Sequence, residues 1–142
     1  LRACQYRFIV LRNEPSSIAD AYGIIKVMLR DYKLEDIRLI ANGIETYKEG
    51  EKLSSNIAAV VEKFLNSHIS GLHPIREDGS VLKAIRASTP VVCHNPNSPA
   101  SEDFGALAKE VINLKQSSSV TGNLQFFLEK MVAQDASQAM SK

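Results

Sequence analysis

The residues best suited to chemistry stand where two expected strands end. One apolar run is followed by Asn42, and another is followed by Arg76, Glu77 and Asp78. The carboxyl ends of parallel strands share one edge of a sheet, where α/β proteins bind ligands. An asparagine amide offers a donor and an acceptor to the edge of a flat heterocycle. Two of these residues are equally typical of ordinary structure, because Asn42-Gly43 is a common turn and Arg76 a common solvated arginine.

No complete catalytic motif accompanies these groups. The sequence contains neither GxxxxGK[ST] nor GxGxxG, and it has no serine nucleophile elbow, HExxH or CxxC. His94 adjoins Cys93, but no two potential ligands stand at a recurrent zinc spacing. The residues alone therefore predict no catalytic site and no metal site.

The composition is that of an ordinary globular domain. A chain of 142 residues suffices for one domain with a real core, and 44% hydrophobic and 23% charged residues argue against disorder. The net charge of +1 gives no electrostatic case for nucleic acid as a partner. No apolar run reaches the length of a membrane span. Cys4 and Cys93 lie in apolar stretches, so we expect buried, reduced thiols of a cytosolic protein.

Strand and helix patterns alternate along the chain. Apolar runs predict strands at 6–11, 37–41, 69–75 and 90–93. Apolar residues at helical spacing predict helices at about 17–31, 53–65, 80–86 and 101–112. This order predicts an α/β fold whose mostly parallel sheet has helices on both faces.

The character of the chain changes after residue 114. We expect a Ser-rich linker at 115–123, an amphipathic helix at 124–133 and a flexible tail at 134–142. The apolar stripe of that helix comprises Leu124, Phe127, Leu128 and Met131.

The first strand begins close to Leu1, and the sequence has no initiator Met. A buried strand needs a neighbour, so we expect either missing upstream sequence or a neighbouring strand from another copy. We therefore predict self-association, as a dimer or a swapped assembly.

Several segments resemble one family, in the same order. EPSSIADAY at 14–22 is similar to the EPTSITDAY segment of the MinD/ParA-type deviant Walker ATPases, and IREDGSVLKA at 75–84 is similar to their IPxDxxVxxA segment. LIAN at 39–42 resembles the strand that ends in the asparagine recognising adenine. GNLQFFLEK at 122–130 resembles the carboxyl-terminal GxxxFFxER of the flagellar-number regulator branch. The resemblance covers nearly the whole chain.

The resemblance implies the carboxyl-terminal half of such an ATPase, with a partial P-loop NTPase fold of the MinD type. The half that holds the ATP phosphates and Mg²⁺ is absent from these residues, so the parent protein would be the ATPase and this chain alone would not hydrolyse ATP. The adenine side of the pocket would comprise Asn42, Arg76, Glu77 and Asp78, with Glu14 near a nucleotide-bridged dimer face. Arg76 replaces the family's proline, which loosens the loop and adds a charge.

The same resemblance implies partners and a location. Relatives restrain the transcription activator of flagellar genes and work with a signal-recognition-type GTPase, and their tail helix docks on the body or on the membrane. The segment 124–132 has one acid and one base, so it lacks the cationic face that favours anionic lipid. Packing on protein is therefore favoured over the inner-membrane surface, and the implied location is cytoplasmic.

Two other hypotheses stay open. A non-enzymatic regulatory or interaction module with a degenerate nucleotide site would explain the missing phosphate half and Arg76. An unrelated flavodoxin-like binding domain would be favoured by a stable monomer with a bound cofactor.

Overall fold

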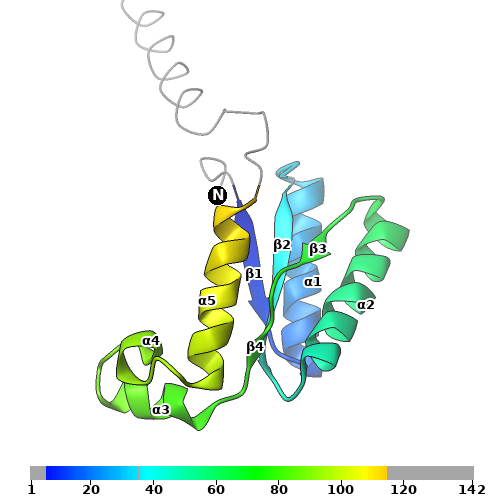
Figure 1. Ribbon diagram of the computed structural model, residues 1–142. Coiled ribbons are helices and arrows are strands. Elements are labelled where there is room, and N and C mark those ends of the chain that lie inside the picture. The colour runs from blue at the N-terminus through cyan, green and yellow to red at the C-terminus, as the bar shows by residue number, and fades with distance from the viewer. Residues whose placement is uncertain (1–5, 35, 115–142) are drawn as a thin grey trace, which may run out of the picture. The chain divides into compact units, whose positions relative to one another are not determined.

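The computed structural model describes residues 6–34 and 36–114, which form an α/β fold (Figure 1). The elements follow one another as β1 Arg7–Leu11, α1 Pro15–Arg30, β2 Ile37–Ile44, α2 Tyr47–Leu65, β3 Ser70–Gly71, β4 Ile75–Arg76, α3 Gly79–Arg86, α4 Val91–His94 and α5 Pro99–Ile112. The linker, helix and tail predicted for 115–142 lie outside the described residues, as does Cys4. None of the described helices is long and apolar enough to cross a membrane.

Strand β2 is the central strand of the sheet. It pairs in parallel with β3 near its start and with β4 near its end, and β1 is its other neighbour. The register with β4 shifts between Asn42 and Ile44, where Gly43 has a φ of +66°. Glycine is favoured at this left-handed conformation. The irregularity turns the end of β2 at the edge where the site was predicted.

Alternating side chains of β2 face two apolar cores. Ile37, Leu39 and Ala41 pack in one core with residues of β1, α1 and α2, whereas Ile40 packs in a second core with Ala100 of α5. Figure 1 shows α1 and α2 on one side of the sheet and α5 on the other. The predicted α/β class, with a mostly parallel sheet and helices on both faces, is therefore confirmed.

The single strand predicted at 69–75 is wrong, because two short strands, β3 and β4, take its place. Pro74 has no N–H to donate to a ladder. The amide of His73 donates instead to Glu110 Oε2 of α5, at 2.6 Å. The Leu72 amide still donates to the Leu39 carbonyl of β2 at 2.8 Å, so the chain leaves the sheet at His73 and Pro74, where it contacts α5.

The strand predicted at 90–93 is also wrong, because this segment is the helical turn α4. The amides of Cys93 and His94 both donate to the carbonyl of Pro90, at 2.9 Å. Pro90 pre-sets the backbone for this turn. Cys93 is consequently exposed, which corrects the expectation of a buried thiol.

Two helices begin earlier than their apolar stripes predict. Helix α2 begins at Tyr47 because Thr46 Oγ1 accepts from the amide of Glu49 at 3.3 Å, while Glu49 Oε2 accepts from the amide of Glu45 at 2.9 Å. This reciprocal arrangement is close to a capping box. Helix α5 begins at Pro99, and Ser98 caps it.

Candidate functional site

Three of the five predicted site residues, Glu14, Asn42 and Glu77, lie where β1, β2 and β4 end. We call this the strand-end surface, which comprises Arg12, Glu14, Asn42, Gly43 and Glu77. Arg12 Nε donates to Glu14 Oε1 at 2.8 Å, and Arg12 Nη2 lies 3.9 Å from Glu77 Oε2. These side chains are about half or more exposed, so both ion pairs are open to solvent. Arg12 therefore links the end of β1 to Glu77, which follows β4.

Asn42 is half-buried in β2, opposite Ile75 of β4. Its side-chain amide makes no hydrogen bond to another of the described residues, so its donor and its acceptor have no partner among them. A Cβ atom at the neighbouring Gly43 would lie 2.8 Å from Arg12 Nη1. The Arg12 guanidinium therefore covers the backbone next to Asn42, and a ligand there would meet it.

Arg12 is the functional candidate that sequence reasoning missed. Its one signal was its position directly after the strand at 6–11. Nothing in the residue type distinguishes it from other exposed arginines, because its neighbours Gly43 and Glu77 are distant along the chain.

Arg76 is engaged with α5. Its Nε donates to Asp103 Oδ2 and its Nη2 to Asp103 Oδ1, both at 2.9 Å, while its amide donates to Oδ2 at 2.9 Å. Its Nη2 also reaches Glu102 Oε2 at 3.2 Å. The Asp103 side chain is 1% exposed and that of Arg76 25%. This geometry is a buried, bidentate ion pair that ties β4 to α5.

Tyr47 and His73 complete what we call the Asp103 cluster, with Arg76 and Asp103. Tyr47 OH donates to Asp103 Oδ1 at 2.6 Å, and His73 Nε2 lies 3.5 Å from the same oxygen. Burial opposes ionisation, but hydrogen bonds from Arg76 and Tyr47 outweigh it and lower the pKa of Asp103 to about 2. The hydrogen bond to Asp103 raises the pKa of Tyr47. The cluster is thus built around a stable carboxylate.

Asp78 is a structural cap. Its Oδ1 accepts from the amide of Ser80 at 2.8 Å at the start of α3, and its Oδ2 accepts from the amide of Ala100 at 3.1 Å. The Ser80 amide, together with that of Ala100, lowers the pKa of Asp78 to about 2 despite partial desolvation. The carboxylate of Asp78 is therefore occupied by backbone donors.

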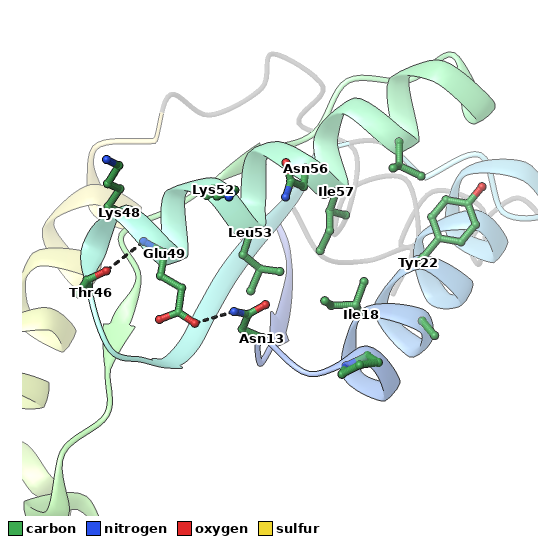
Figure 2. Close-up of a pocket in the computed structure, with 13 residues that line it drawn as sticks. Asn13, Ile18, Tyr22, Thr46, Lys48, Glu49, Lys52, Leu53, Asn56 and Ile57 are labelled. Carbon is green, nitrogen blue, oxygen red and sulfur yellow. Dashed lines mark hydrogen bonds between the residues drawn. The ribbon is translucent and has the colours of Figure 1, made fainter.

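A separate groove lies between α1 and α2 (Figure 2). Its volume is about 950 Å³, and its apolar walls include Ile18 and Tyr22 of α1 and Leu53, Ile57 and Val60 of α2. The polar residues that line it are Asn13, Thr46, Lys48, Glu49, Lys52 and Asn56. We call this the α1–α2 groove.

Glu49 of the groove is already committed to internal contacts. Its Oε1 accepts from Asn13 Nδ2 at 2.6 Å, and its Oε2 accepts from the Glu45 amide. The Asn13 hydrogen bond, with help from the Glu45 amide, lowers the pKa of Glu49. Both carboxylate oxygens of Glu49 therefore already accept hydrogen bonds, one from Asn13 and one from the Glu45 amide.

The part of the chain that the structure describes holds no cluster of three or more metal-binding side chains. In comparisons with known proteins, no family model matches the chain. Over 136 residues, which are 96% of this chain, the sequence is 34% identical to the antiactivator FleN of Pseudomonas aeruginosa. The match spans 49% of that protein, so the chain covers about half of this relative's length.

Proposed function

We propose that this chain, which is 34% identical to the antiactivator FleN over 96% of its length, supplies the base-binding part of an ATP-dependent flagellar-number regulator of the MinD/ParA type. The complete regulator binds ATP with Mg²⁺, dimerises in the cytoplasm and restrains flagellar gene activation or assembly. Its partners are a flagellar transcription activator and a signal-recognition-type GTPase. This chain alone does not hydrolyse ATP, because its residues include no phosphate loop.

One observation supports the proposal: the side-chain amide of Asn42, near the end of β2, forms no hydrogen bond to another described residue. An asparagine that bonds to no other described residue can give both its donor and its acceptor to the edge of adenine. The guanidinium of Arg12 lies against the neighbouring Gly43 and can stack on a flat ring. Glu14 and Glu77 hold that guanidinium from two sides, which supports a pre-arranged surface.

A second candidate is a regulatory module whose nucleotide site is degenerate. It is favoured by the contacts of Arg76 and Asp78, whose side chains bond to Asp103 and to backbone amides. Two of the residues expected near adenine therefore have structural partners. In this candidate, partner proteins bind the chain and ATP does not.

The two candidates are separated by nuclear magnetic resonance titration of the ¹⁵N-labelled chain with adenosine, with guanosine as the comparison. Adenosine lacks phosphates, so its binding does not require a phosphate loop. We expect amide shifts at 42–44 and at Glu77 with adenosine alone. Asn42→Ala removes the donor and acceptor and weakens adenosine binding by about tenfold or more.

Asn97→Ala, an exposed asparagine in the loop before α5, is the matched control and should bind like the parent chain. Equal shifts with both nucleosides, or an Asn42→Ala variant that binds normally, would rule out base recognition at the strand-end surface. The degenerate-site candidate would then be the better one. Calorimetric titration with ATP–Mg²⁺ and ADP tests whether phosphates add affinity.

A further inference from the structure

The bond between Asn42 and Gly43 joins the two residue types that most favour spontaneous loss of ammonia from an asparagine. The nucleophile in that reaction is the backbone nitrogen of the following residue, which attacks Cγ of the asparagine side chain. A glycine has no Cβ to obstruct the approach, and it permits the backbone angles that a cyclic imide requires. Asn42 is the single asparagine of the sequence that precedes a glycine.

The fold places this bond at an irregular point of the sheet. The register between β2 and β4 shifts between Asn42 and Ile44, and Gly43 has a φ of +66°. Such an irregularity leaves a residue out of the ladder, so the backbone is held less firmly here than in a regular strand. Asn42 and Gly43 are both half-buried, so solvent has access to the reacting atoms.

The side chain of Asn42 is not held by hydrogen bonds within the described part of the chain. The carboxamides of Asn13 and Asn95, by contrast, donate to Glu49 Oε1 and to Ser80 Oγ. A carboxamide that is engaged in this way must give up its hydrogen bond before it cyclises. Asn42 has no such contact to lose, so its Cγ can turn toward the Gly43 nitrogen.

We propose that Asn42-Gly43 is a site at which this chain modifies itself by deamidation. The Gly43 nitrogen gives its proton to solvent base and forms a bond to Asn42 Cγ. The Cγ–Nδ2 bond breaks, and ammonia leaves with a proton taken from water. One water molecule then opens the cyclic imide at either carbonyl, which gives aspartate or isoaspartate, and the main chain of isoaspartate runs through the side-chain carbon atoms.

The modification would change the strand-end surface, and this consequence rests on the proposed function. Aspartate at position 42 is an acceptor only, so the donor proposed to recognise adenine is lost. Isoaspartate adds a carbon atom to the main chain before Ile44, which is fully buried and whose carbonyl accepts from the Glu77 amide at 2.9 Å. Both products therefore end base binding at this surface.

The test is peptide mapping by mass spectrometry after the folded full chain is incubated at mildly alkaline pH. The exchange of NH₂ for OH raises the mass of a peptide, and an isoaspartyl methyltransferase labels the isoaspartate product. We expect Asn42 to convert faster than Asn66 and Asn97, which are exposed but precede serine. Asn42→Gln should abolish the conversion of its own peptide, because glutamine must close a larger and less favourable ring. Asn66→Gln, the matched control, should leave the conversion of Asn42 unchanged.

Two outcomes of the mapping would overturn the proposal. One is conversion of Asn42 no faster than that of Asn66 or Asn97. The other is conversion of Asn42 only after urea has unfolded the chain, which would show that β2 protects the bond.

The effect on base binding is measured separately. Asn42→Asp should bind adenosine about tenfold or more weakly than the parent chain. Normal binding by this variant would refute the loss of base recognition on deamidation. A parent chain that binds no adenosine would refute the proposed function instead, and the mapping would still decide whether Asn42 deamidates.

Discussion

Replacing the carboxylate of Asp103 by an amide should cost more stability than any other single change of charge at the end of β4. The side chain is 1% exposed and accepts from the Arg76 guanidinium, the Arg76 amide and Tyr47 OH. Its pKa falls from 3.8 to about 2 in the folded chain. That difference corresponds to about 2 kcal/mol in favour of the folded state at neutral pH.

Asp103→Asn removes this contribution and turns an N–H₂ group toward donors that need an acceptor, which adds about 1 kcal/mol. We therefore expect a loss of about 3 kcal/mol in the free energy of unfolding, measured by urea denaturation at neutral pH. Glu102→Gln is the matched control. Glu102 bonds to the same guanidinium, but its side chain is 65% exposed, so its loss should cost less than about 1 kcal/mol.

The pH dependence of the free energy of unfolding distinguishes the contribution of the Asp103 charge from that of its packing. Because the pKa of Asp103 is depressed, its contribution is fully present above about pH 3.8 and is lost as the pH falls through about 2. The difference between the parent chain and Asp103→Asn should therefore shrink from about 3 to about 1 kcal/mol between neutral pH and about pH 2. A difference that stays constant over this range, or equal losses for Asp103→Asn and Glu102→Gln, would refute the reasoning.

Three further predictions test packing, helix propensity and the corrected element at 90–93. Gly50→Ala should cost about 1–3 kcal/mol, because its Cβ would lie 2.7 Å from Pro74 Cβ. In thermal or urea unfolding, Gly23→Ala should instead gain up to about 1 kcal/mol, because no atom lies within 4 Å of the new Cβ. In a Cys4→Ser background, the exposed Cys93 should react with a thiol reagent in the folded chain, whereas protection until unfolding would restore the predicted strand.

The sequence predicted the elements that local patterning determines. The first two strands are long apolar runs, and the apolar face of α2 repeats at helical spacing, so both could be recognised. The prediction of a strand at 90–93 was wrong because Val-Val-Cys has the composition of a strand but forms the helical turn α4. Whether such a short run becomes a strand depends on a neighbour with which to pair, and here the carbonyl of Pro90 accepts from its amides instead.

The α1–α2 groove could not be predicted for a related reason. The sequence placed Ile18, Tyr22 and Val60 on apolar faces, which is correct, and such faces are expected to be covered. The sequence pattern does not show how much of the apolar face of α2 is covered by α1. The packing of α1 against α2 leaves Val60 40% exposed in the groove that Lys52 also lines.

The loop Arg76, Glu77 and Asp78 illustrates why residue types alone could not define the site. Successive residues of an extended chain point in opposite directions, so one apparent charged patch divides into three roles. Arg76 bonds to Asp103 of α5, Glu77 lies near Arg12 at the strand-end surface, and Asp78 caps α3. Arg76 therefore acts on stability first. Base recognition should then depend on Asn42, so Asp103→Asn should lower stability and leave adenosine contacts in place, whereas Asn42→Ala should do the reverse.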